Sequence, residues 1–107
     1  MSAGIIDGNV QGLYLASLSL DPANVATITC AEQDFTVPGV RAGDMILSFN
    51  METVTAGLGV AGYRVKAANT VSVTFVNPTA GGINAAAVTC KMCIARPDAT
   101  LYSGLPS

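Results

Sequence analysis

The sequence predicts an all-β fold: an antiparallel β-sandwich or a jelly-roll-like barrel of about seven or eight short strands, with little helix. Apolar and polar residues alternate along much of the chain, which is the pattern of half-buried strands. Clusters of Gly, Pro, Asn and Asp interrupt this alternation about every 8–12 residues, as turns do in such folds. No stretch has the 3.6-residue spacing of an amphipathic helix, so only residues 85–87 and the 51–58 loop leave room for a single helical turn.

Four strands are expected in the N-terminal half, and their alternation is the less regular. They lie at 13–20, 24–30, 34–37 and 44–50. The inward residues expected of the last three are Ala26, Ile28, Cys30, Phe35, Val37, Leu47 and Phe49. Turn signals at Asp21-Pro22, Pro38-Gly39 and Ala42-Gly43-Asp44 separate them. We therefore interpret Asp44 as a hairpin-turn residue.

Three strands with clearer alternation follow in the C-terminal half, at 60–68, 70–76 and 88–96. The first strand places Tyr63, Val65 and Ala67 on the face opposite Arg64 and Lys66. The second places Val71, Val73 and Phe75 on the face opposite Thr70, Ser72 and Thr74. The third places Val88, Cys90, Met92 and Ile94 inward. Turns are expected at Ala68-Asn69, Asn77-Pro78 and Gly81-Gly82.

Composition limits the function classes. The 107 residues fit a single β domain, 1–107, with possible extended arms at 1–12 and 97–107. Only 11% of the residues are charged, against about 25% in typical soluble domains, and 50% are hydrophobic. Such a chain is expected to bury surface against other proteins.

A membrane or nucleic-acid partner is not expected. No apolar run approaches the roughly 20 residues of a membrane-spanning helix. The N-terminal residues MSAGIIDGNVQG lack Lys, Arg and a long apolar run, so we expect no signal peptide and synthesis in the cytoplasm. Five basic residues and a net charge of -2 argue against nucleic-acid binding.

The segment Gly57-Leu58-Gly59-Val60-Ala61-Gly62 fits the G-x-G-x-x-G pattern of dinucleotide-binding loops. That function requires a following helix and an acidic residue about 20 positions later. Here a strand, a turn and a second strand follow, and no acidic residue lies between Glu52 and Asp98. The glycines are therefore expected to shape a loop, and no cofactor is predicted.

A metal or redox site is not predicted either. Cys90 and Cys93 form a C-x-x-C pair, but on an extended strand their side chains point to opposite faces. Zinc needs four ligands, and the chain offers these two cysteines, Cys30 and no histidine. We expect Cys30 and Cys90 in the core and Cys93 at a surface or interface.

Catalytic residues are not predicted. The absence of His removes the usual base for a serine or cysteine nucleophile. Glu32 and Asp34 have the i, i+2 spacing of an acid pair on one strand face, but a solvated, charged loop is the favoured interpretation.

One resemblance adds to these inferences. The segment from Pro38 to Asp44, Gly57-Leu58-Gly59, the run from Arg64 to Thr79 and a last strand closing on Arg96 resemble small β-rich virion proteins of tailed bacteriophages. The similarity covers residues 37–96 and is greatest to head decoration, or cement, proteins. It implies a non-enzymatic homo-oligomer on the capsid surface of the virion, with the major capsid protein as its partner and stabilisation of the head as its role. Two alternatives stay open: a tail, fibre or receptor-binding module of the virion, and a small enzyme.

The two chain ends supply the expected contact residues. These are Ile5, Ile6, Leu13, Tyr14, Leu101, Tyr102 and Leu105, with Leu15 beside them. They lie among Gly, Ser and Pro residues, in segments that would not order alone. Alternatively, Leu13 and Leu15 belong to an ordinary first strand and the tail frays.

Overall fold

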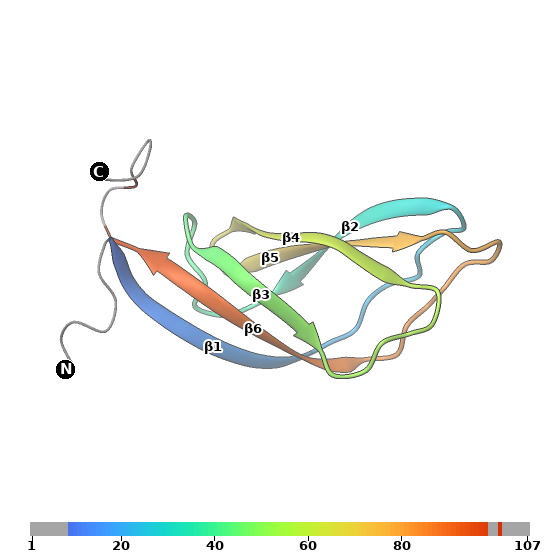
Figure 1. The fold of residues 1–107 in the computed structure, drawn as a ribbon, viewed down its shortest axis with the longest axis horizontal. Helices are drawn as coiled ribbons and strands as arrows, with labels where there is room; N and C mark the ends of the chain where they lie inside the picture. Colours follow the sequence, from blue (N-terminus) through green and yellow to red (C-terminus); the bar gives the residue numbers. More distant parts are fainter. Residues whose placement is uncertain (1–8, 99–100, 102–107) are drawn as a thin grey trace.

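Six strands form two three-stranded antiparallel sheets in the computed structural model, which describes residues 9–98 and 101 (Figure 1). They are β1 (Val10–Leu20), β2 (Thr29–Thr36), β3 (Met45–Met51), β4 (Gly59–Ala67), β5 (Thr70–Asn77) and β6 (Val88–Pro97). One sheet has the order β1-β6-β3 and the other β2-β5-β4. The expected all-β sandwich is confirmed, and no helix occurs among the described residues, including 85–87 and the 51–58 loop.

The strand number is six and not seven or eight, because two expected strands are one. Residues 24–28 precede β2 as loop, and Ile28 has a positive φ of 48°. The alternation then runs unbroken from Thr29 to Thr36, so there is no turn between the expected strands at 24–30 and 34–37. The expected inward set of Ala26, Ile28 and Cys30 is therefore wrong: all three are exposed, and the inward residues of β2 are Ala31 and Phe35.

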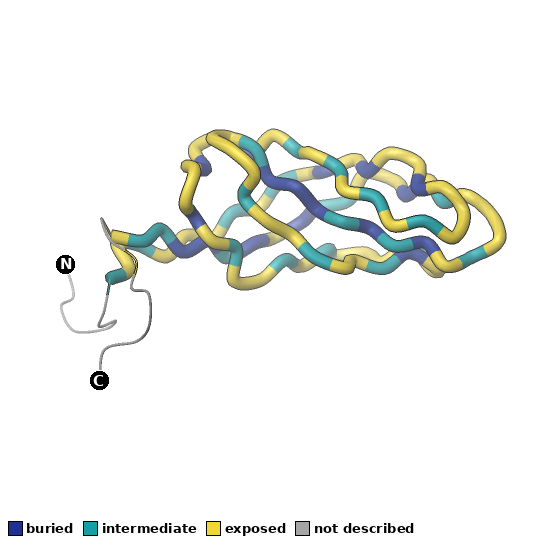
Figure 2. Tube along the Cα trace, turned by 90° about the horizontal axis from the view of Figure 1, so that it is seen from above, coloured by how far each residue is buried: buried dark blue, intermediate teal, exposed yellow. Residues whose placement is uncertain are grey.

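The core lies between the central strands of the two sheets, and buried positions follow these strands in Figure 2. Val71, Val73 and Phe75 of β5 are fully buried, as predicted, and Cys90, Met92 and Ile94 of β6 face them. Phe35 meets Phe75 edge to face, with ring centroids 6.3 Å apart. The predicted turn at Ala68-Asn69 connects β4 to β5, with Asn69 at a φ of 59°.

Leu47 is a second correction. It was expected inward, but it is exposed, whereas its neighbours Ile46 and Phe49 pack against the core. A bulge causes this difference, since the register of β3 against β6 shifts between Ile46 and Ser48. Two residues of β3, Leu47 and Ser48, therefore stand opposite Cys93 on the outer face.

The chain ends overlap the expected arms. Residues 10–12 belong to β1 and Pro97 belongs to β6, so these parts of the arms 1–12 and 97–107 are strand. Ile5, Ile6, Tyr102 and Leu105 lie outside the described residues. No helix long and apolar enough to span a membrane occurs in the part of the chain that the structure describes.

The glycines of the dinucleotide-like pattern shape a turn and a strand. Gly57 lies in the turn before β4 at a φ of 83°, and Gly59 and Gly62 belong to β4 itself. The chain continues from Gly62 along β4, through the turn at Ala68-Asn69, into β5. Among the described residues after Gly62, no helix occurs that could direct its N-terminus at a phosphate.

Gly57→Ala is expected to destabilise the fold by about 1–2 kcal/mol. The positive φ strains any other residue, and an added Cβ would lie 2.9 Å from Cγ2 of Thr79. Gly62→Ala is the matched control, because a Cβ there meets nothing within 4 Å and no positive φ is recorded. Urea unfolding of both variants measures the difference, and equal midpoints would contradict the strain at Gly57.

Candidate interaction surface

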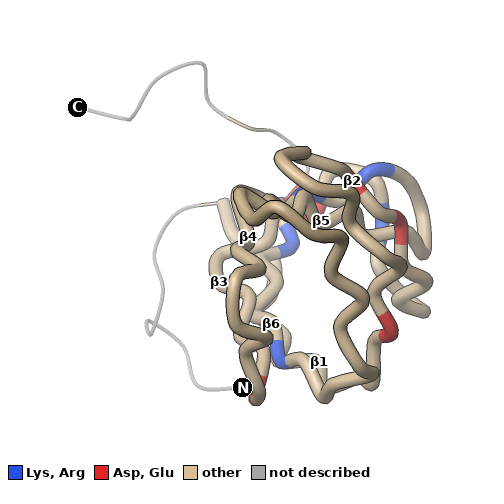
Figure 3. Tube along the Cα trace, turned by 90° about the vertical axis from the view of Figure 1, so that its right-hand side faces the viewer, with Lys and Arg blue, Asp and Glu red and all other residues tan. Residues whose placement is uncertain are grey.

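The outer faces of the two sheets differ in chemistry. Among the described strands, β2 and β4 carry two acidic and two basic residues, β6 carries Lys91 and Arg96, and β1 carries no charged residue (Figure 3). We call these the charged face and, on the β1-β6-β3 sheet, the apolar patch. Each is built from neighbouring side chains across three strands.

On the charged face, side chains from the two edge strands meet over β5. Arg64 of β4 forms a two-pronged ion pair with Glu32 of β2, at 2.8 and 2.9 Å. Lys66 lies 2.8 Å from Asp34, which also accepts a 2.6 Å hydrogen bond from the Ser72 hydroxyl of β5. Glu32 and Asp34 thus share one strand face, and the favoured interpretation of them as a charged loop is wrong. The strand alternation extends through both of them.

These contacts set the titration of both acids. The hydrogen bond from Arg64 lowers the pKa of Glu32, and the hydrogen bond from Lys66, followed by that from Ser72, lowers the pKa of Asp34. Both carboxyls are therefore ionised and paired at neutral pH. These ion pairs join the edge strands β2 and β4 across β5, which is a structural role.

The apolar patch consists of two rows across the β1-β6-β3 sheet. Its members are Leu13 and Leu15 of β1, Ala95 and Cys93 of β6, and Met45 and Leu47 of β3. In the first row Leu13 and Met45 both pair with Ala95; in the second, Leu15 and the bulge with Leu47 flank Cys93. The exposed fraction is 87% for Leu15, 54% for Met45 and Leu47, and 46% for Leu13.

The patch ends where polar residues replace the leucines. The following rows contain Ser17, Lys91 and Asn50, then Ser19 and Thr89. Exposed apolar residues scattered singly are common on proteins, but a contiguous group is typical of a binding surface. The apolar patch is therefore the candidate functional site.

Among the expected contact residues, Leu13 lies in the patch and Tyr14 does not. Tyr14 follows Leu13 on the strand and points between the sheets, where its ring lies over Gly12 and 5.1 Å from the Arg96 guanidinium. Leu101 is exposed, beyond β6. The local alternation does not indicate Met45 as a contact residue, and it places Leu47 inward because nothing in it marks the bulge.

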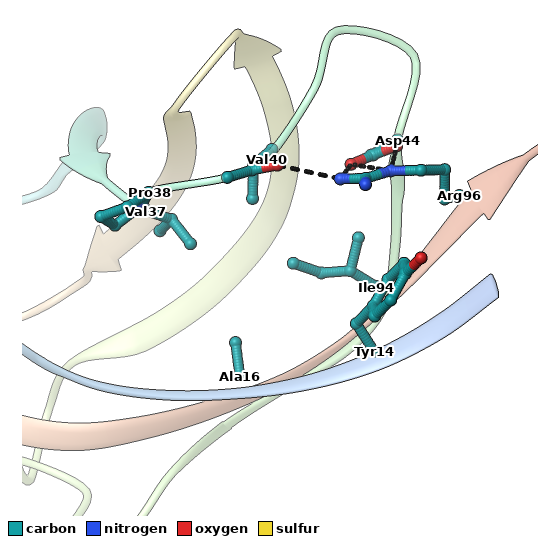
Figure 4. A pocket seen from close by; sticks show the side chains of 9 residues that line it. Tyr14, Ala16, Val37, Pro38, Val40, Asp44, Ile94 and Arg96 are labelled. Atoms are coloured by element: carbon teal, nitrogen blue, oxygen red, sulfur yellow. Dashed lines mark hydrogen bonds and ion pairs between the residues drawn. The ribbon is translucent and has the colours of Figure 1, made fainter.

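A cavity of about 260 Å³ opens between the sheets at the end nearest the patch (Figure 4). Its lining is mostly apolar, with Tyr14, Val40 and Ile94 among its residues. The two charged groups on its wall bind each other: Arg96 contacts Asp44 at 2.8 Å and also donates to the Gly39 carbonyl. The charges of this cavity are thus used in holding the fold together.

Asp44 is not merely the turn residue expected from the sequence. Its carboxylate accepts hydrogen bonds from the Arg96 side chain and from the Arg41 backbone N–H, and only 2% of its side chain is exposed. The hydrogen bonds from Arg96 are the main cause that lowers the pKa of Asp44. The loop before β3 is thereby fastened to β6.

The cysteines occupy opposite sides of β6. Cys90 is buried, as predicted, and burial raises the pKa of its thiol. Cys93 is half-buried in the apolar patch, and both are free thiols. Within residues 9–98 and 101, no three His, Cys, Asp or Glu side chains lie together as metal ligands would.

Comparisons of the chain with protein-family models, with curated proteins and with solved structures found no match.

Proposed function

We propose that this protein is a non-enzymatic structural subunit of a tailed-phage virion that binds the outer capsid lattice and stabilises the head. The observation that carries the proposal is the apolar patch, set on a sandwich whose opposite outer face is charged. The major capsid protein is the proposed partner, and the capsid surface is the proposed location. The likeness of residues 37–96 to decoration proteins supplies the identity of the partner.

The two faces support a defined orientation on such a shell. Burying the apolar patch removes leucine and methionine side chains from water, at about 25 cal/mol per Å² of apolar surface. The charged face would then point to solvent, where its ion pairs need no partner. Among the described residues, two of the three exposed ion pairs lie on the charged face, and the third, Lys91 with Glu52, lies beyond the apolar patch on the other sheet, so the placement of charge favours this orientation.

Stabilisation of a shell needs only modest affinity per subunit. A protein that binds the assembled lattice and not its dissociated subunits strengthens the lattice by mass action. Repetition of one site over the lattice adds avidity when copies are linked. The patch is small, which fits many weak, repeated contacts better than one tight complex.

Leu47→Lys is expected to weaken binding to undecorated heads by roughly tenfold to a hundredfold. Burial of a leucine is worth about 1.5–3 kcal/mol, and each 1.4 kcal/mol corresponds to tenfold in the dissociation constant. Thr36→Lys, on the outer face of β2, introduces the same charge on the opposite sheet and should bind as the unchanged protein does. Co-sedimentation with heads gives the affinities, and calorimetry of the heads gives the rise in melting temperature.

The outcomes separate this function from its alternatives. Undecorated heads that neither bind the unchanged protein nor melt at a higher temperature with it would overturn the proposal. Binding to glycans or to tail components in the same assays would favour a receptor-binding or tail module. Equal loss with Thr36→Lys and Leu47→Lys would exclude the apolar patch as the contact.

A further inference from the structure

We propose that two copies of this chain pair through the free edge of β1, antiparallel about a two-fold axis perpendicular to the sheet. The pairing joins two β1-β6-β3 sheets into one six-stranded sheet. The role of this pair on a capsid rests on the proposed function. The existence of the pair does not. The partner is a second copy of this chain.

The four edge strands of the sandwich are protected unequally against pairing with another strand. The edge strand β2 carries Glu32 and Asp34, and β4 carries Arg64 and Lys66 and has two irregularities in its register. Charges and bulges of this kind are the usual devices that keep sheet edges apart. The β2-β5-β4 sheet is therefore closed to further strands.

The edge of β1 lacks these devices. It is the longest strand, with 11 residues from Val10 to Leu20, and it contains no charged residue and no proline. Its only irregularity lies at its beginning, between Val10 and Gly12. By contrast β3 has 7 residues, a central bulge, and the exposed acid Glu52 directly after it. An edge as long and uncharged as β1 is a template for another strand.

Backbone groups are available along this edge. The described residues place one neighbouring strand, β6, beside β1. In an antiparallel pair, every second residue exchanges its N–H and C=O with the neighbour, so the others direct theirs away from it. A second strand would accept and donate these hydrogen bonds without any change in β1.

The distribution of charge favours a second copy of β1 as that strand. Self-pairing of β2 would bring acids against acids, and self-pairing of β4 would bring bases against bases. Self-pairing of β1 opposes no charges, because the strand has none. Like charges directly opposite each other destabilise a strand pair, so charge excludes β2 and β4. Of the two uncharged edges, β1 is long and regular, whereas β3 is short and bulged, which favours β1.

The apolar patch selects the register. A two-fold axis perpendicular to the sheet keeps outward residues outward in both copies, so outward residues must pair with outward residues. When Tyr14 stands opposite Tyr14 of the second copy, Leu13 stands opposite Leu15 of that copy. The exposed leucines Leu13 and Leu15 of both chains then lie side by side, and the two apolar patches become one surface.

This joined surface bears on the proposed function. A pair of chains presents two identical patches on one sheet face, so both can rest on the same shell. The second contact becomes intramolecular once the first has formed, which raises avidity without a new kind of contact. The pair would thus bind a lattice more tightly than a single chain of the same sequence.

Disulfide formation between chains tests the pairing and its register. In a background of Cys30→Ser and Cys93→Ser, Leu13→Cys and Leu15→Cys are prepared as separate proteins, mixed and oxidised. The proposed register places these residues opposite each other, so the mixture is expected to give far more cross-linked dimer than either protein alone. Identical positions lie about 8 Å apart in this register, beyond the reach of a disulfide. Equal cross-linking in all three samples would overturn the register, and none in any sample would overturn the pairing.

Sedimentation equilibrium over a range of concentrations tests the pairing without cross-links. The unchanged protein is expected to dimerise, and Leu15→Lys to shift the equilibrium to monomer. Leu47→Lys is the matched control, since it adds the same charge to the same face on β3, away from the β1 edge. A monomer at every concentration would overturn the inference. If the amide protons along the whole of β1 exchange slowly in such a monomer, another segment of the same chain covers this edge.

The two proposals fail separately. A protein that dimerises and loses its dimer with Leu15→Lys, but does not bind heads, keeps the inference and refutes the proposed function. A monomer that binds heads and loses binding with Leu47→Lys refutes the inference and keeps the function.

Discussion

Asp44→Ala is expected to lower the free energy of unfolding by about 3 kcal/mol, because it removes a buried carboxylate that pairs with the largely covered Arg96 side chain. For a domain of this size that corresponds to a fall in melting temperature of roughly 12–24 °C. Only 16% of the Arg96 side chain and 2% of the Asp44 side chain are exposed. The same change also removes the acceptor of the Arg41 backbone N–H.

Glu52→Ala is the control for this prediction. Glu52 forms an ion pair with Lys91 at 3.5 Å, but 45% and 58% of the two side chains are exposed. Exposed pairs typically contribute about 0–1 kcal/mol, so Glu52→Ala should melt within a few degrees of the unchanged protein. Melting followed by circular dichroism compares the two, and equal small shifts would show that the Asp44 pair contributes no more than a surface pair.

The same pair gives the protein an acid-sensitive stability. The folded-state pKa of Asp44 is lowered from its ordinary value of 3.8, so its stabilisation is fully present above that value and is lost as the pH falls through the lower, folded-state pKa. Asp34 and Glu32 act in the same direction, but they are exposed and contribute less. Asp44→Ala should therefore be less sensitive to acid below about pH 4 than the unchanged protein. An identical pH profile for both would contradict this assignment.

Local alternation predicted the core of this fold well. The inward sets of β5 and β6 were both correct, because each central strand is covered on its inner face along its whole length. The turn at Ala68-Asn69 was also correct, since a two-residue connection needs a residue that tolerates a positive φ, as Asn69 does. The two-residue alternation of apolar and polar residues is sufficient to predict the inward residues where a strand is regular.

The errors fall where the period is interrupted. The bulge in β3 turned Leu47 outward, and β2 begins only at Thr29 with Ala31 and Phe35 inward, which exposes Cys30. The ion pair of Asp44 with Arg96 joins residues 52 positions apart, so no local pattern could indicate it. The candidate site was half predicted for the same reason: Leu13 and Leu15 are adjacent in the alternation, but Met45 and Leu47 join them only through β6.

The uneven distribution of charge connects the fold to the proposed role. Arg64 and Lys66 together with their acids hold the two edges of one sheet across β5 and keep those edges soluble. On the other sheet β1 carries no charge, and the exposed Lys91 of β6 lies beyond the apolar patch. The proposed contact surface is therefore the part of the sandwich from which charged side chains are absent, the apolar patch.

Asn77→Asp is expected to destabilise the protein by more than 3 kcal/mol, because it replaces a buried hydrogen-bond donor with an acceptor. The Asn77 side chain is fully buried, and its amide nitrogen donates to the carbonyls of Val25 and Gly81 at 3.0 and 2.9 Å. Its oxygen accepts hydrogen bonds from the Thr79 backbone and hydroxyl. An aspartate there would set an acceptor against two carbonyls, and it would separate Val25 from its backbone pairing with Ile83.

Asn50→Asp makes the same chemical change at an exposed position of β3 and should alter stability by no more than about 0.5 kcal/mol. The pH dependence distinguishes a buried charge from simple loss of packing. Burial among carbonyls would raise the pKa of an aspartate at position 77, so its penalty grows as the pH rises above its unfolded value and shrinks in acid. The stability of Asn77→Asp should therefore approach that of the unchanged protein near pH 4. This trend is opposite to the effect of Asp44, whose protonation lowers stability in acid. A deficit that is constant from pH 4 to pH 8 would mean that position 77 contributes shape alone, and that the amide does not fasten the loop after β5 to the segment before β2.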